Sequence, residues 1–109
     1  MAKSYKVLAQ SAPLATTETN LYTVPSSTSA VTSTLTVCNR GGSTASYRIA
    51  IRPDSVSISD EHYVAYDATL PANDTIALTL GLTLGTNDVI TVYASTASVS
   101  FGLFGSEIA

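Results

Sequence analysis

Apolar and polar side chains alternate with a period of two along most of this chain. The clearest stretch is 30–39, where Leu35 and Val37 alternate with threonines, so that one face is apolar and the other hydroxylated. This pattern predicts a strand with one buried face. Residues 47–52 alternate in the same way. The Gly-Gly turn that separates the two stretches predicts that they form a hairpin.

Six further short stretches have strand-like patterns. They lie at residues 5–10, 21–24, 62–67, 75–80 (with Ile76, Leu78 and Leu80 turned inward), 89–94 and 98–104. No segment has the 3.6-residue period of an amphipathic helix. About eight short strands separated by turn residues predict an all-β fold, a single antiparallel β-sandwich over residues 1–109. Immunoglobulin-like and jelly-roll arrangements both fit, although the lack of Trp and of a cysteine pair excludes an antibody-type domain.

The chain carries few charges. Charged residues make up 12% of the 109 positions, about half the usual share in a soluble protein. Ser and Thr supply most of the polarity, with 15 and 16 residues. A free monomer normally has more Lys and Glu on its surface, so we expect part of this surface to be covered by partners.

The charge pattern and the apolar runs exclude two kinds of partner. The five basic residues are scattered and the net charge is −3, which argues against nucleic-acid binding. No apolar run approaches the roughly 20 residues that cross a bilayer, so no membrane partner is expected. The short apolar run Val7-Leu8-Ala9 does not resemble a signal-peptide core, which predicts synthesis and assembly in a cytoplasm.

Candidate reaction chemistry is sparse. His62 is the single histidine and Cys38 the single cysteine, and they lie on different predicted strands. A His62 base beside Asp60 and Glu61, or a Cys-His pair, is a weaker interpretation than a polar corner and a strand thiol. The carboxylates in turns could offer oxygens to calcium, but no calcium-loop spacing occurs and ordinary turn chemistry explains them. We therefore predict no enzyme activity, no cofactor and no metal site.

The tyrosines are the candidate recognition residues. Tyr47 shares the inward register of Ile49 and is expected in the core. The alternation predicts that Tyr63 and Tyr66 lie on opposite faces of one strand, so that at least one points outward. The candidate interface residues are Tyr5, Leu21, Tyr22, Tyr63 and Tyr66. Residues 1–20 are rich in turns and weakly patterned, which suggests an N-terminal arm that contacts neighbours.

Several segments resemble a family of small virion proteins of tailed bacteriophages. The resemblance covers nearly the whole chain. It is carried by Ser4-Tyr5-Lys6-Val7-Leu8-Ala9-Gln10-Ser11-Ala12-Pro13, Leu21-Tyr22-Thr23-Val24-Pro25, Val37-Cys38-Asn39-Arg40-Gly41, Tyr47-Arg48-Ile49-Ala50-Ile51-Arg52-Pro53 and the closing residues 101–107. These are structural signatures and contain no catalytic motif.

The resemblance implies a structural protein of the virion. The leading hypothesis is a capsid decoration or cement protein that forms trimers and stabilises the shell by contacts with itself and with the major capsid protein. A protein of the tail, baseplate or fibre-attachment region is the first alternative, in which the partners are tail proteins. A module that binds host-surface glycans is the second.

Overall fold

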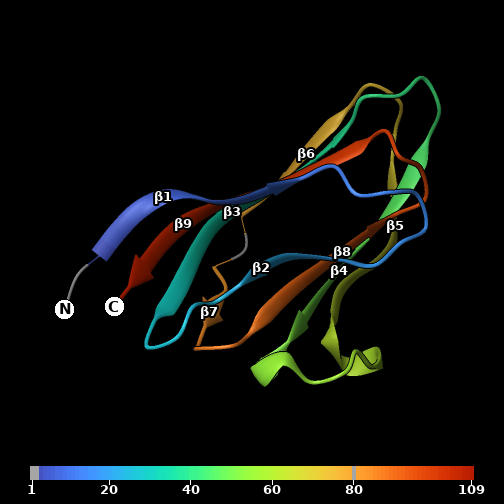
Figure 1. Ribbon diagram of the computed structural model, residues 1–109. Coiled ribbons are helices and arrows are strands. Elements are labelled where there is room, and N and C mark those ends of the chain that lie inside the picture. The colour runs from blue at the N-terminus through green and yellow to red at the C-terminus, as the bar shows by residue number, and fades with distance from the viewer. Residues whose placement is uncertain (1–2, 80) are drawn as a thin grey trace.

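Nine strands form two antiparallel sheets that pack face to face in the computed structural model, which describes residues 3–79 and 81–109 (Figure 1). The first sheet contains, in spatial order, β1 (Lys3–Ser11), β9 (Val99–Ile108), β3 (Ser29–Asn39) and β6 (Thr75–Leu78), and β7 (Thr83–Leu84) also pairs with β3. The second sheet contains β2 (Thr19–Thr23), β8 (Val89–Ala94), β4 (Ala45–Arg52) and β5 (Tyr63–Leu70). The predicted antiparallel β-sandwich is confirmed.

The strand order is that of a jelly roll. With the two-residue β7 set aside, the sheets have the orders β1-β9-β3-β6 and β2-β8-β4-β5, and every pairing is antiparallel. Among these eight strands, β4 and β5 alone are consecutive in the chain and paired in one sheet. The other connections pass from one sheet to the other, as in the double-sheet Greek-key arrangement. This order decides between the two sandwich arrangements that the sequence left open.

The hairpin predicted between residues 30–39 and 47–52 is wrong. Both stretches are strands, but β3 belongs to the first sheet and β4 to the second. The Gly41-Gly42 connection is therefore an arch between sheets. The alternation of side chains shows which face of each strand is buried, and it is the same whether the next strand pairs beside it or packs opposite it.

Asn39 holds this arch in place. It is almost fully buried at the end of β3. Its side-chain amide donates to the carbonyl oxygens of Ser43 in the arch and of Leu70 and Pro71 at the end of β5. Its side-chain oxygen accepts a hydrogen bond from the Gly41 N–H at 2.9 Å. One side chain thus links the two sheets and satisfies backbone groups that burial would otherwise leave unpaired.

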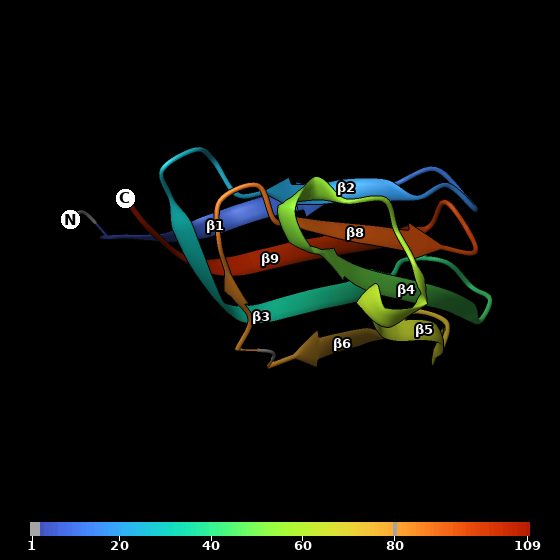
Figure 2. The same cartoon turned by 90° about the horizontal axis from the view of Figure 1, so that it is seen from below.

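The core lies between the sheets and is built from inward-facing residues of both. Its largest fully buried side chains include Leu35, Ile49, Leu70, Ile90 and Leu103. Tyr47 is 4% exposed, which confirms its expected place in the core. The molecule measures 45 × 27 × 19 Å, and the strands run along its long dimension (Figure 2).

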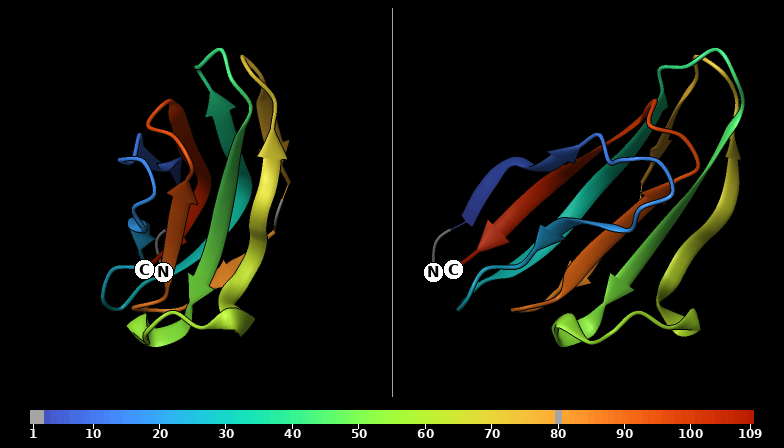
Figure 3. Two further views of the ribbon diagram at one scale, coloured as in Figure 1. Left: turned by 90° about the vertical axis from the view of Figure 1, so that its right-hand side faces the viewer. Right: turned by 45° about the vertical axis from the view of Figure 1, so that its right-hand side comes forward.

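Two short 3₁₀ turns, Pro53–Ser55 and Asp60–His62, lie between β4 and β5 at one end of the sandwich (Figure 3). No α-helix occurs in residues 3–79 and 81–109. The residues expected to turn inward on the sixth strand include Leu80, which lies outside the described residues. Ile76 and Leu78 pack against the core as expected.

The segment 1–20 contains an edge strand. Residues Lys3–Ser11 pair with β9 along the strand, from Lys3 opposite Ile108 to Ser11 opposite Phe101. The start of β1 therefore lies beside the end of β9 (Figure 1). The described part of the proposed arm is tied to its own sheet, and a contact between it and a neighbouring subunit stays a prediction.

Candidate interaction surfaces

The outer face of the first sheet bears no charged side chain between its two ends in the part of the chain described. It is formed by residues that alternate with the buried ones along β1, β9, β3 and β6. They are Tyr5, Val7 and Gln10 on β1; Ser100, Gly102, Phe104 and Ser106 on β9; Val31, Thr34, Thr36 and Cys38 on β3; and Thr75 and Ala77 on β6. We call this surface the uncharged face. Lys3 lies at its margin, opposite Ile108.

Aromatic and branched side chains stand out from the uncharged face. Tyr5 is 79% exposed, Val7 50% and Val31 39%. Phe104 lies along the sheet over Gly102, since a Cβ added to that glycine would come within 3.2 Å of the Phe104 ring. Shallow hollows of about 430 and 370 Å³ lie on the two sides of Phe104. The face is therefore apolar and hydroxylated, with relief that a partner could fill.

The outer face of the second sheet has a different chemistry, because two bulges in β5 change its register. Tyr66 and Asp67 together lie opposite Arg48, and Val64 is an extra residue between Ala65 and Tyr63. Asp67 has a positive φ of 51°. Bulges of this kind re-aim side chains.

The prediction that Tyr63 and Tyr66 lie on opposite faces is wrong for this reason. Their ring centroids are 4.8 Å apart and their planes are at 85°. The bulge at Val64 shifts the alternation, so that both tyrosines point to the outside of the sheet. No feature of the isolated sequence marks this bulge.

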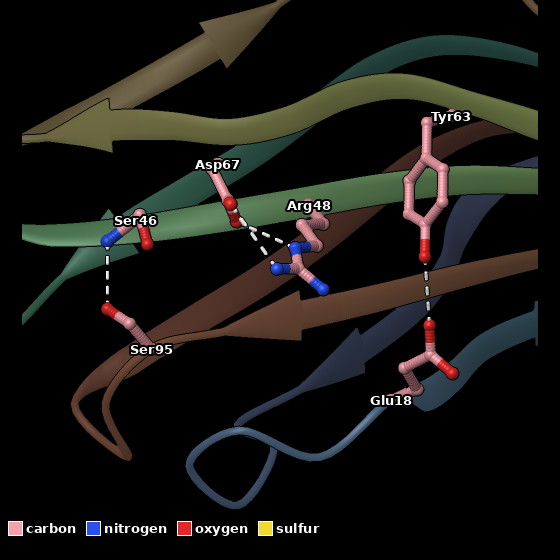
Figure 4. Close-up of polar contacts among 6 residues, drawn as sticks. All are labelled: Glu18, Ser46, Arg48, Tyr63, Asp67 and Ser95. Atoms are coloured by element: carbon pink, nitrogen blue, oxygen red, sulfur yellow. Dashed lines mark hydrogen bonds and ion pairs between the residues drawn. The ribbon is translucent and has the colours of Figure 1, made fainter. Parts of the chain in front are cut away.

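Arg48 organises the centre of this face. Its guanidinium carbon lies 4.2 Å from the centroid of the Tyr66 ring and 4.3 Å from that of Tyr93. Asp67 accepts hydrogen bonds from its Nε and Nη2 atoms at 2.6 and 3.3 Å (Figure 4). The guanidinium holds the pKa of the Asp67 carboxyl below its usual value. Because Asp67 fixes the guanidinium of Arg48, and the guanidinium contacts the rings of Tyr66 and Tyr93, these two rings are held in place in the free protein.

Tyr63 spans the sheet toward the chain segment that precedes β2. Its hydroxyl donates to Glu18 at 3.0 Å (Figure 4). Tyr63 is paired with Ala50, which belongs to the outer register and yet is 1% exposed. Burial and the Glu18 carboxylate raise the pKa of the Tyr63 hydroxyl. The backbone N–H of Ser46 donates to the hydroxyl of Ser95 at 2.9 Å and so joins β4 to the residue after β8 (Figure 4).

An open pocket of about 510 Å³ adjoins this cluster and is lined by Asp60, Tyr63 and Tyr66. Tyr66 is 58% exposed. We call this hollow the tyrosine pocket. It combines aromatic walls with a carboxylate.

The structure separates the candidate interface residues predicted from the sequence. Tyr5 lies on the uncharged face, whereas Tyr63 and Tyr66 lie on the second sheet. Leu21 and Tyr22 are each 8% exposed and belong to the core, so their side chains are not available to a partner of the folded protomer. Phe104 and Arg48 were missed, because their roles depend on neighbouring strands that are distant in sequence.

The two residues weighed for catalysis lie apart in the fold. Cys38 is on the uncharged face of the first sheet, and His62 is in the turn before β5 of the second. His62 Nδ1 accepts a hydrogen bond from the Ser59 N–H at 3.1 Å. Within residues 3–79 and 81–109, no group of three or more His, Cys, Asp or Glu side chains is arranged to hold a metal ion. The same residues include no helix long and apolar enough to cross a membrane.

Comparison of the chain with protein-family models, with curated proteins and with solved structures yields no match.

Proposed function

We propose that this protein is a non-enzymatic structural protein of a virus particle and that it packs against neighbouring subunits through its uncharged face. The observation that carries the proposal is that, among the residues described by the structure, none that lies on that face between its ends is charged, whereas Tyr5, Val7 and Val31 are exposed there. Two such surfaces can approach without like-charge repulsion and without burying an unpaired ion.

The size of the uncharged face fits a subunit contact. The strands β1, β9, β3 and β6 contain 9, 10, 11 and 4 residues, and at about 3.3 Å per residue and a strand spacing of about 4.8 Å they cover about 540 Å². Two copies would bury about 1,100 Å² in total, near the lower limit for a specific interface. Apolar burial of this extent favours association, and contacts with a shell protein would add to it.

The sequence resemblance implies a structural protein of the particle, and within the particle we propose that the protein decorates and stabilises the capsid. Jelly rolls are common in viral capsid proteins, which supports the proposal by analogy of fold alone. A place in the tail, baseplate or fibre attachment uses the same face and is the alternative. Copy number separates them, because a shell protein is present in hundreds of copies per particle and a tail protein in tens or fewer.

The uncharged face is tested by introducing charge at exposed positions. We expect the purified protein to associate in sedimentation-velocity experiments over a range of concentrations. Contact between two uncharged faces gives dimers, whereas the trimer expected from the sequence would need this face to meet a different patch of the next copy. Val7→Lys with Val31→Lys should weaken association more than about tenfold, since each lysine would be buried without a partner. Ser57→Lys, in the exposed loop between the two turns, is the matched control and should leave association unchanged.

A monomer at all concentrations, or association that the two lysines do not alter, would contradict the use of this face. Cys38 offers a second readout, because it is the single cysteine and lies on the face. Its reaction with a thiol reagent should slow as the protein associates. Quantitative mass spectrometry of purified particles then tests the virion itself, and absence of the protein from them would overturn the proposal.

A further inference from the structure

The tyrosine pocket carries negative charge that the surrounding residues do not balance. In residues 3–79 and 81–109, neither Asp60 nor Glu18 forms an ion pair. Two arginines of β4 lie on this face. Asp67 already neutralises Arg48, and Arg52 donates to Thr91, Asn20 and Val56 and not to Asp60 or Glu18. An anionic ligand would therefore be repelled, which leaves neutral and cationic groups.

The shape of the pocket favours a compact cation. The rings of Tyr63 and Tyr66 are nearly perpendicular, at 85°, and form two walls of a corner. A flat sugar ring stacks best on one open aromatic face, whereas an ammonium group is attracted by two ring systems at once. The Asp60 carboxylate at the same pocket supplies the opposite charge.

Beside the tyrosine pocket, a cation of the protein itself is already held by two tyrosine rings and a carboxylate. Arg48 lies between Tyr66 and Tyr93 with both rings within 4.3 Å of its guanidinium carbon, and a carboxylate completes its surroundings. The pocket repeats the same elements, two tyrosines and an aspartate. It differs in having no cation of the described chain in it.

We propose that the tyrosine pocket receives a lysine side chain from a basic segment of a different protein of the particle. This rests on the proposed function, which supplies such a neighbour. A second copy of this chain is a poor source of the cation, because it has only five Lys and Arg residues. Lys6 and Arg48 are paired with their own carboxylates, Arg52 donates to Thr91, Asn20 and Val56, and Arg40 donates to the Ala97 carbonyl oxygen. The remaining basic residue, Lys3, lies at the margin of the uncharged face on the other sheet.

The test is an NMR titration of the full-length protein with two tripeptides that differ only in charge. Acetyl-Gly-Lys-Gly-amide is the probe, and the same peptide with norleucine in place of lysine is its uncharged counterpart. We expect the lysine peptide to shift the signals of Tyr63 and Tyr66 with millimolar affinity, and the norleucine peptide to bind about tenfold more weakly. Binding should weaken with added salt, because the pocket is open to solvent.

Variants locate the binding. Asp60→Asn and Tyr66→Leu should each weaken the lysine peptide by about three- to tenfold, since one removes the charge and the other a ring. Tyr66→Phe keeps the ring and should retain binding. Tyr5→Leu alters an exposed tyrosine on the other sheet and should have no effect. Circular dichroism of each variant verifies the fold.

Equal binding of the two peptides, or shifts outside the pocket, would overturn the proposal. So would tighter binding of methyl glucoside than of the lysine peptide with no response to Asp60→Asn, an outcome that identifies a glycan site instead. The titration does not depend on association through the uncharged face. A failure here and a failure of the proposed function are therefore distinguishable.

Discussion

The hydroxyl of Tyr22 on β2 donates a hydrogen bond to the carboxylate of Glu107 on β9 and so joins the two sheets beside the edge strand β1. Lys6 on β1 lies 2.6 Å from the other carboxylate oxygen of Glu107. Three strands thus meet at one carboxylate. The contacts with Lys6 and then Tyr22 lower the pKa of the Glu107 carboxyl, while burial and then the Glu107 hydrogen bond raise the pKa of Tyr22.

This contact predicts a stability that depends on pH. Because the pKa of Glu107 is lower in the folded protein than its value of 4.5 in the unfolded chain, its contribution is present above about pH 4.5 and is lost as pH falls through the folded pKa. Glu107→Gln should make the free energy of unfolding, measured with urea, less dependent on pH between about pH 5 and pH 3. Tyr22→Phe should cost about 2 kcal/mol at neutral pH. An unchanged pH profile in Glu107→Gln would contradict this account.

Asn39 is expected to be the most sensitive polar residue of the described chain. Asn39→Ala removes the amide and oxygen that satisfy the arch and the end of β5, and should lower the free energy of unfolding by about 3 kcal/mol. Asn39→Asp should be worse, since a carboxylate would face backbone carbonyl oxygens. Ser57→Ala, at an exposed loop position, should stay within about 0.5 kcal/mol. Denaturant midpoints measure all three.

Two glycines provide a matched pair for backbone packing. A Cβ at Gly105 would lie 2.3 Å from the Val31 carbonyl oxygen, whereas one at Gly42 would meet nothing within 4 Å. Gly105→Ala should therefore destabilise the protein by about 2 kcal/mol or more, because the obstructing atom belongs to the backbone. Gly42→Ala should be close to neutral. Equal thermal midpoints for the two variants would show that β9 and β3 are not this close.

Asp67 combines a backbone requirement with a charge. Its φ of 51° suits Asn and Asp better than Ala, and its carboxylate orients Arg48. We expect Asp67→Asn to lower the thermal midpoint less than Asp67→Ala, because Asn keeps the backbone preference and loses only the charge. Loosening of the Arg48 stack should appear in both as altered ring-current shifts of Tyr93. A midpoint for Asp67→Asn as low as that of Asp67→Ala would mean that the ion pair outweighs the backbone term.

The strands themselves were predictable because their signal is local. The alternation of Leu35 and Val37 with threonines predicts β3, and residues 89–94 coincide with β8. Tyr47 could be assigned to the core from its register with Ile49. The end of β9 was missed, because residues 105–108 are held by pairing with β1 and β3 and lack a clear apolar alternation.

The candidate surfaces were predictable only in part. An excess of hydroxyl over charged side chains indicated a covered surface, and Tyr5 proved to be exposed on the uncharged face. Tyr22 carries no local signal that separates it from Tyr5, since each lies in a short strand. Tyr22 is buried because it points from the second sheet toward the first, where its hydroxyl donates to Glu107.

A period of two along the backbone is enough to show that this chain forms sheets with one buried face, because the side chains of a strand point alternately to its two sides whatever lies next to it. This period does not show which strands pair with one another. The assignment of β3 and β4 to different sheets and the joint outward turn of Tyr63 and Tyr66 depend on pairings and bulges between segments far apart in the chain. Those arise when both sheets bury their apolar faces at once, and they place the residues that a neighbouring molecule would meet.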